Sequence, residues 1–329
     1  MLIENIELTM SHVGLGTLNE YALLLLFGNA HSHHLTLNTG ICPDEIKDNQ
    51  GLTLYPAYFM THLKVPKNLL LSTYKLWDNI SVGVDVARFG ETILESLYVL
   101  GKQGEIASDT ARWDLEKYPS MRANSLIIVD VGETGGFARK VSIPKPECIA
   151  VLPKVSRAPE AIPRSKNIRS SGFGFEPGNL KTLDPIVYYV ASDQDAAPGH
   201  AMVFAKFTRI MDWAEYIMLS QQLKPGFPSN VLQYLSVLER ETFYYGNCFA
   251  GETLEVYIKG TIKECDPNYH GDSLQIISVA ILSCQIEIYL QRNKTLLAIA
   301  NAKKLLALPT SSQDFIPDIK RIINNLNKN

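Results

Sequence analysis

A histidine, two glycines and an asparagine lie close together near the N-terminus, and together they could act on a carbonyl group. The histidine and the glycines precede the apolar segment 18–27, which is predicted to form a helix and contains the asparagine near its start. Backbone N–H groups in a glycine turn at the positive end of a helix dipole can stabilise an enolate or oxyanion. A tight turn without a chemical role explains the glycines about as well. The predicted donors are the backbone groups of Gly14, Leu15 and Gly16 and the side-chain amide of Asn19.

His12 is predicted to be catalytic because it lies just before this turn. A histidine close to a helix N-terminus tends to be neutral, so it can accept a proton or donate to a substrate. An ordinary structural role is the alternative.

The segment Leu54-Tyr-Pro-Ala-Tyr-Phe59 is an aromatic cluster in a predicted strand. Tyr55 directly precedes Pro56, where the strand ladder is interrupted because proline has no N–H to donate. Alternation puts Tyr55 and Phe59 on one face and Tyr58 on the other. On residue type alone, Tyr55 is more simply a core aromatic with a satisfied hydroxyl.

The histidine cluster His31-Ser-His-His34 could bind a metal, but no Asp, Glu or Cys stands close by at ligand spacing. We therefore interpret it as the polar end of a helix and expect no metal. The sequence also lacks the nucleophile elbow, the phosphate loop and the zinc-binding helix motif, so no common cofactor site is predicted.

The chain has 329 residues, of which 46% are hydrophobic and 20% are charged, and its formal net charge is -3. This composition favours a folded core and argues against disorder and against nucleic-acid binding through bulk charge. The longest apolar run, 22–27, is far shorter than the ~20 residues of a membrane span, and the acidic N-terminus is unlike a signal peptide. Five widely spaced cysteines are expected to be reduced thiols. We expect a cytoplasmic protein with no membrane partner.

Two stretches of the chain resemble each other. Each has a turn and then an apolar helix with a Glu-Tyr pair near its start, Glu20-Tyr21 in the first and Glu215-Tyr216 in the second. Asp212 is predicted to cap the second helix, after an extended lead-in over 202–208. Segments with period-two alternation follow each helix and predict strands. These predicted strands cover 52–65, 80–89, 233–245, 254–259, 274–284 and 285–290.

The segment 153–184 separates the two stretches, and its four prolines and six basic residues predict a long surface connection without regular structure. The predicted division is therefore 1–152, 153–184 and 185–329. Three basic residues of the connection could pair with phosphates or with an acidic partner, although a solvated loop explains them equally well. They are Arg164, Lys166 and Arg169.

A helix followed by a curled antiparallel sheet, repeated once, indicates an α+β protein of the double hot-dog architecture, with two helix-wrapped antiparallel sheets fused in one chain. The apolar run 22–27 supports this, because a helix enclosed by a sheet is hydrophobic on most of its faces. We also predict a tight turn at 132–136 and a final helix over 314–325.

Three blocks of sequence resemble the LnmK-like family of bifunctional acyltransferase/decarboxylases, which accompany polyketide assembly lines. The blocks are Met10-Ser-His-Val-Gly-Leu-Gly-Thr-Leu-Asn-Glu20, Leu54-Tyr-Pro-Ala-Tyr-Phe59 and 195–212 with Val203-Phe-Ala-Lys-Phe207. The resemblance extends from about 10 to about 303 and includes Tyr245-Gly-Asn247. It departs at 197–200, where Ala-Pro-Gly-His replaces the Asn-Gly that is usual in the family, so contacts from the second half carry over less securely.

The resemblance implies an enzyme that takes methylmalonyl-CoA or malonyl-CoA, forms an acyl ester on a tyrosine and decarboxylates it. The decarboxylated group, propionyl in the first case, then passes to an acyl carrier protein. The family's tyrosine matches Tyr55, with Tyr58 as the fallback. His12 is the candidate to accept the phenolic proton, because a phenol with a pKa of about 10 is a poor nucleophile at neutral pH. Coenzyme A enters as part of the substrate, and the basic residues of 153–184 are candidate contacts for it or for the carrier.

Two other functions stay open. A hot-dog thioesterase or dehydratase acting on carrier-bound acyl chains usually pairs an acid with a histidine, and Glu20 and His12 could supply that pair. A non-catalytic double hot-dog could bind acyl carriers as a scaffold. The sequence does not define the acyl group, the carrier protein or whether two copies associate as a homodimer.

Overall fold

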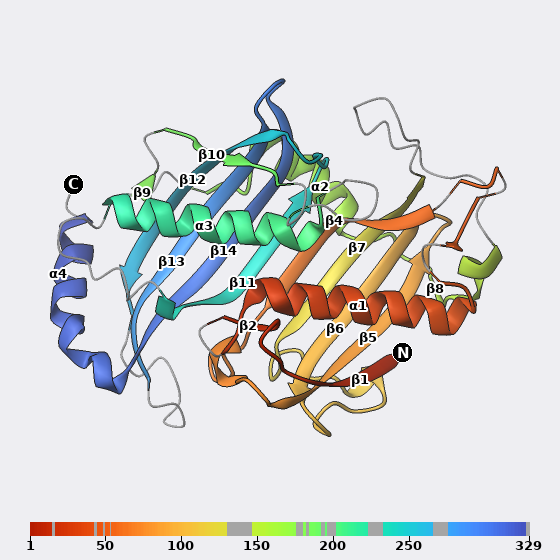
Figure 1. The fold of residues 1–329 in the computed structure, drawn as a ribbon, viewed down its shortest axis with the longest axis horizontal. Coiled ribbons are helices and arrows are strands. Elements are labelled where there is room, and N and C mark those ends of the chain that lie inside the picture. The colour runs from red at the N-terminus through yellow and green to blue at the C-terminus, as the bar shows by residue number, and fades with distance from the viewer. Residues whose placement is uncertain are drawn as a thin grey trace. The chain divides into compact units, whose positions relative to one another are not determined.

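In the computed structural model, the chain forms two compact units. Unit 1 comprises 1–63 and 74–167, and unit 2 comprises 64–73 and 168–329. In each unit one long helix lies against an antiparallel sheet (Figure 1). The described residues are 1–14, 17–42, 45–48, 50–52, 54–129, 147–175, 180–181, 184–191, 195, 202–222, 233–265 and 276–326.

The sheet of unit 1 has the strand order β1-β5-β6-β7-β4. Side chains alternate across β5, so that Val82, Val84 and Val86 are buried under the helix as the alternation in the sequence predicts. The bounds are β1 (Leu2–Glu7), β4 (Leu54–Lys64), β5 (Asn79–Phe89), β6 (Ile93–Lys102) and β7 (Ser120–Val129), with the short strands β2 (Val13–Gly14), β3 (Thr17–Leu18) and β8 (Lys154–Val155).

Helix α1 (Glu20–Thr39) is longer than the sequence predicts. Asn19 caps its N-terminus, and Gly40, in the left-handed region with φ 72°, ends it. The histidine cluster lies within the helix, so its interpretation as a helix end is wrong. His31 and His34 are buried and His33 is exposed, because residues three or four apart share a helix face with the apolar residues before them.

The sheet of unit 2 has the order β11-β14-β13-β12-β10 and carries helix α3 (Phe204–Gln222). The segments predicted as two strands over 274–290 form the single strand β13. The predicted C-terminal helix is confirmed as α4 (Ile316–Leu326), which follows a 3-10 turn (Thr310–Phe315). The remaining bounds are β9 (Leu180–Lys181), β10 (Ile186–Tyr189), β11 (Leu235–Tyr244), β12 (Thr253–Glu264), β13 (Ile276–Leu290) and β14 (Thr295–Pro309).

Three local predictions are wrong. Asp212 is not a cap, because α3 begins at Phe204 and the expected extended lead-in is helical from that residue onward. The two Glu-Tyr pairs are therefore not equivalent: Glu20 is the first residue of its helix, whereas Glu215 lies well inside α3.

The segment 153–184 contains a regular element, α2 (Ala161–Ser171). Pro153 and Pro159 precede this helix and Pro163 lies in its first turn, where backbone N–H groups have no helical partner, whereas Pro177 lies outside the described residues. The predicted turn at 132–136 lies outside the described residues.

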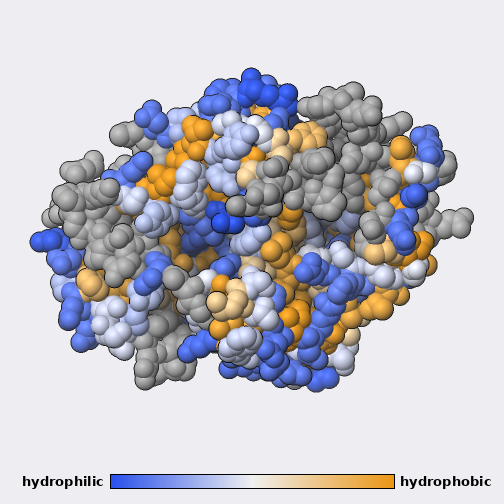
Figure 2. All heavy atoms as spheres, in the orientation of Figure 1, coloured by the Kyte–Doolittle hydropathy of each residue, from blue (hydrophilic) through white to orange (hydrophobic). Residues whose placement is uncertain are grey.

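The core of each unit is apolar and lies between the helix and the sheet. In unit 1, Phe27 on α1 stacks on Tyr98 of β6, with ring centroids 5.1 Å apart, and both are fully buried. Exposed apolar residues are interspersed with hydrophilic ones over the face shown in Figure 2. Across the described ranges, no helix is both long and apolar enough to cross a membrane. Each unit thus has the helix-on-sheet arrangement that the sequence predicts.

Candidate functional site

The hairpin of β2 and β3 brings the N-terminal candidates together at the start of α1 (Figure 1). Val13 pairs with Leu18 and Gly14 with Thr17. This register brings His12, before the first strand, next to Asn19, after the second. Leu15 and Gly16, the other two predicted donors, lie outside the described residues.

Asn19 is held by the backbone of the helix. Its Oδ1 accepts a hydrogen bond of 2.8 Å from the N–H of Ala22, which is the usual bond of an N-cap. Its Nδ2 faces the hairpin, since a Cβ atom added to Gly14 would lie 3.2 Å from it. One end of the amide therefore caps the helix, and its donor end points toward the predicted carbonyl site.

His12 is anchored to the turn that precedes it. Its Nδ1 accepts a hydrogen bond of 3.0 Å from the N–H of Thr9 and lies 3.2 Å from the hydroxyl of the same residue. In a neutral ring with Nδ1 as acceptor, the proton is on Nε2. This geometry favours His12 as a hydrogen-bond donor through Nε2, rather than as the base that accepts a phenolic proton.

Glu20 is the first residue of α1 and is only 5% exposed. A carboxylate at this end of a helix is stabilised by the positive pole of the helix dipole. Glu20 also directly follows Asn19, which the hairpin brings beside His12. The hairpin register and the helix start thus place an acid, an amide and an imidazole on neighbouring backbone positions at one helix end.

The two candidate tyrosines lie on β4 in unit 1. The side chain of Tyr55 lies outside the described part of the chain, so only its place in the strand is known. The hydroxyl of Tyr58 lies 2.9 Å from that of Tyr98 on β6. The hydroxyl of Tyr98 in turn lies 2.8 Å from Nδ1 of His31 on α1. A chain of hydrogen bonds therefore runs from half-buried Tyr58 to a fully buried imidazole.

Burial determines which groups along this series of hydrogen bonds are charged. It raises the pKa of Tyr98 well above that of an ordinary tyrosine, with the neighbouring Tyr58 adding to the effect. Burial also lowers the pKa of His31 to about 3, with a smaller contribution from His34. Tyr98 and His31 are therefore neutral at pH 7. The spacing of His31, four residues after Phe27, could have indicated its inward position, but nothing in the sequence connects it to Tyr98.

Acid is expected to destabilise unit 1 through His31. The unfolded chain binds a proton near pH 6.5 and the folded one only near pH 3, so the contribution of His31 to stability is complete above pH 6.5 and falls as the pH drops. At pH 5 the loss amounts to about 2 kcal/mol. Urea unfolding at pH 7 and pH 5 measures it, and His31→Gln should lose less stability than the wild type. An equal loss of stability in both proteins would contradict the prediction that folding lowers the pKa of His31.

The three basic candidates lie on α2 and are exposed. At 100° per residue, Lys166 and Arg169 point to one side of the helix and Arg164 to the other. The guanidinium of Arg169 lies 5.3 Å from the ring centroid of Tyr245, within reach of a cation–π interaction. The three cations thus do not form one cluster.

Unit 2 has a buried charge cluster where unit 1 has the tyrosine and histidine chain. Arg240 on β11 binds Asp212 at 2.6 Å and Glu215 at 3.1 Å. Lys304 on β14 binds Asp212 at 2.6 Å and Glu215 at 2.5 Å. Burial and the nearby Glu215 raise the pKa of the Cys284 thiol well above its usual value, so that thiol is not a nucleophile. No pattern in the sequence indicates this cluster, because its members come from one helix and two strands far apart in the chain.

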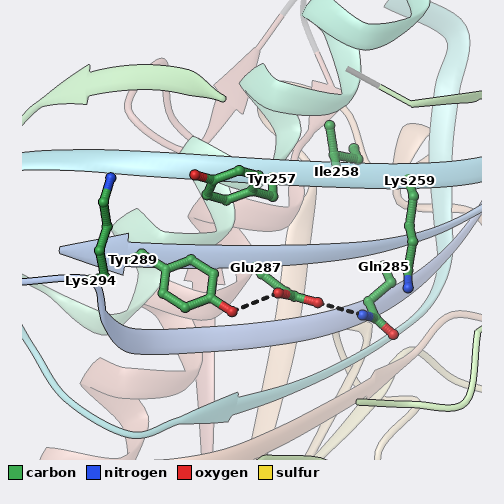
Figure 3. A pocket seen from close by; sticks show the side chains of 7 residues that line it. All are labelled: Tyr257, Ile258, Lys259, Gln285, Glu287, Tyr289 and Lys294. Atoms are coloured by element: carbon green, nitrogen blue, oxygen red, sulfur yellow. Dashed lines mark hydrogen bonds between the residues drawn. The ribbon is translucent and has the colours of Figure 1, made fainter. Parts of the chain in front are cut away.

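A hollow of about 470 Å³ lies on the sheet of unit 2, lined mainly by side chains of β12 and β13 (Figure 3). Glu287 accepts hydrogen bonds there from Gln285 at 2.6 Å and from Tyr289 at 2.7 Å. None of the predicted site residues lines it. Within the described ranges, no group of three or more His, Cys, Asp or Glu residues is arranged to hold a metal ion.

No protein-family model and no curated protein sequence matches the chain. Among solved structures, one assigned as an oleoyl thioesterase from Lactobacillus plantarum is similar with a TM-score of 0.63 and 11% identity, over 93% of this chain and 96% of that one. An acyl-ACP thioesterase from Bacteroides thetaiotaomicron is similar with a TM-score of 0.53 and 11% identity, over 92% of this chain and 96% of the other. At such identity the likeness shows the fold alone: this chain is a double hot-dog, an architecture that it shares with these two thioesterases.

Proposed function

We propose that this chain is an enzyme that hydrolyses acyl thioesters at the start of α1, with Glu20, Asn19 and His12 as its catalytic groups. The observation that carries the proposal is the position of Glu20, a buried carboxylate at a helix N-terminus beside the hairpin that holds His12. The thioesterase assignments of the two proteins with the same fold support the same substrate class.

The proposed reaction uses each group for one task. The carbonyl oxygen of the thioester binds toward the amide of Asn19 and the Nε2–H of His12, which stabilise the oxyanion as it forms. Glu20 accepts a proton from water while the water oxygen bonds to the carbonyl carbon. The carbon–sulfur bond then breaks and the thiolate takes the proton back from Glu20. The products are a carboxylic acid and a free thiol, and no metal or further cofactor takes part.

A second candidate is the acyl transfer with decarboxylation that the LnmK-like resemblance implies. The observation that favours it is the hydrogen-bonded chain from Tyr58 to His31. In that reaction Tyr58 or Tyr55 displaces coenzyme A from malonyl-CoA or methylmalonyl-CoA. Loss of carbon dioxide leaves an enolate, which is protonated, and the acyl group then passes to the thiol of an acyl carrier protein. It ranks second because burial disfavours the charged forms of Tyr98 and His31, and an activated phenolate needs a charged or strongly basic neighbour.

Intact-mass spectrometry separates the candidates. The purified protein is incubated with malonyl-CoA, methylmalonyl-CoA and a long-chain acyl-CoA, with and without a phosphopantetheinylated carrier protein. Hydrolysis predicts free acid and free coenzyme A, with an unmodified protein. An acyl mass on Tyr55 or Tyr58 together with a decarboxylated acyl group on the carrier would establish the second candidate. If every thioester is recovered intact, both reactions are rejected and the carrier-binding scaffold is left.

A further inference from the structure

Trp77 occupies a backbone position that tryptophan seldom adopts. The N–H of Asp78 donates to the carbonyl of Lys75 at 3.0 Å, which closes a β-turn with Trp77 as its third residue. Trp77 has φ 72°, which is the conformation that glycine or asparagine normally supplies in such a turn. Among the described residues with positive φ, seven are glycines and only Trp77 and Lys294 are not. The chain thus places its bulkiest residue type where a glycine is favoured.

The turn is fixed by further hydrogen bonds, although the tryptophan ring is not buried. The N–H of Trp77 donates to the carbonyl of Leu8 at 2.8 Å, and that of Lys75 donates to Oδ2 of Asp78 at 2.8 Å. Trp77 is nevertheless 61% exposed. Burial of the indole therefore offers little to offset the strained backbone, and residues held in such conformations are enriched at functional sites.

Two more exposed residues lie close to Trp77 along the hydrogen-bonded backbone, and the three residues are called the Trp77 patch: Trp77, Met10 and Lys75. Met10 is 72% exposed and lies two residues beyond Leu8, whose backbone binds that of Trp77. Lys75 is exposed and forms an isolated bridge with Thr17 of the β2–β3 hairpin. The patch is therefore attached to the same hairpin that carries the proposed catalytic groups.

We infer that the Trp77 patch binds the adenine nucleotide of coenzyme A, which carries the acyl group to the proposed site. A flat indole on a rigid turn offers a stacking face for a purine, and the flexible thioether of Met10 can pack at its edge. The ammonium of Lys75 is complementary to the phosphates of the nucleotide. A single aromatic face with one cation fits a nucleotide better than a broad protein or lipid surface. This nucleotide site rests on the proposed function, because it has a role in the reaction only if the substrate is an acyl-CoA thioester.

The test uses adenosine 3′,5′-bisphosphate, the nucleotide end of coenzyme A, titrated into the full chain by calorimetry. Trp77→Gly is expected to weaken its binding about tenfold or more. The same variant should not be less stable in urea, because glycine adopts the positive φ without strain. Its KM should rise in the same proportion for acyl-CoA but not for the matching acyl-pantetheine, which lacks the nucleotide. Leu37→Ala removes another exposed apolar side chain, on α1, and should leave the affinity unchanged.

Several results would overturn the inference. The first is that the wild type does not bind adenosine 3′,5′-bisphosphate, and the second is that Trp77→Gly binds it with unchanged affinity. The third is a KM increase in Trp77→Gly that appears only when the substrate is an acyl group carried on an acyl carrier protein. If Trp77→Gly unfolds, Trp77→Asn takes its place, since asparagine tolerates the same conformation. A loss of binding with reduced stability in both variants would make Trp77 structural and also overturn the inference. Nucleotide binding without hydrolysis of any thioester would reject the proposed reaction and leave the nucleotide site standing.

Discussion

Replacement of Glu20 by glutamine is expected to lower kcat for acyl-thioester hydrolysis by about 10²- to 10⁴-fold. Glutamine keeps the size of the side chain but cannot accept the proton of the attacking water. Because Glu20 acts in the chemical step, KM should change little by comparison. Steady-state kinetics with the acyl-CoA that the wild type prefers measures the effect.

The control for this variant is Glu7→Gln, which removes an exposed carboxylate from β1 of the same unit. It should hydrolyse the substrate at the wild-type rate. The unfolding free energy of Glu20→Gln must also be measured, since a buried acid at a helix start contributes to stability. A folded Glu20→Gln protein with wild-type kcat would remove Glu20 from the mechanism. If activity instead depended on Tyr58, the tyrosine-dependent transfer would become the leading function.

Replacement of Arg240 by methionine is expected to lower the free energy of unfolding by about 3–5 kcal/mol. Arg240 is buried and binds both Asp212 and Glu215. Its loss leaves two carboxylates beside one cation, Lys304, and one of those carboxylates, Glu215, is buried away from water. Equilibrium urea unfolding measures the change.

The double variant Arg240→Met with Glu215→Met tests whether charge balance is the cause. It leaves Asp212 paired with Lys304 at 2.6 Å, one charge against one. Replacing a buried ion pair with apolar residues of similar volume is often neutral or stabilising, so the double variant should be more stable than Arg240→Met alone. If the two losses simply added, the four groups would not act as one cluster.

The two units place different chemistry at matching helix positions. His31 is the twelfth residue of α1 and Glu215 is the twelfth of α3, and both point from the helix toward the sheet. Unit 1 holds a neutral imidazole with two tyrosines, and unit 2 holds a carboxylate neutralised by two cations. The repeated fold therefore does not imply a repeated site. The sequence instead suggests that Glu20-Tyr21 corresponds to Glu215-Tyr216. That match compares residue types alone, whereas the two helices begin at Glu20 and Phe204.

The sequence alone determined the fold class and the approximate places of most elements. Alternation predicts β5 and β11 because neighbouring residues along a strand point to opposite faces, which is a local property. The apolar run 22–27 predicts an enclosed helix for a similar reason. The proximity of His12, Asn19 and Glu20 could also be predicted from the sequence, since they lie within nine consecutive residues that contain one tight hairpin.

Only the tertiary structure decided which distant side chains meet. His31 and Tyr98 are 67 residues apart, and Arg240 and Glu215 are 25 residues apart, and each pair meets because a helix packs across a particular strand of a sheet. Strand order in a sheet is not encoded in any local pattern, so neither contact could be derived from residue spacing. The start of α3 and the helix α2 were missed because propensity is weak and tertiary packing overrides it. Burial, which sets the pKa of His31 and the strength of the Arg240 cluster, exists only once those elements have packed.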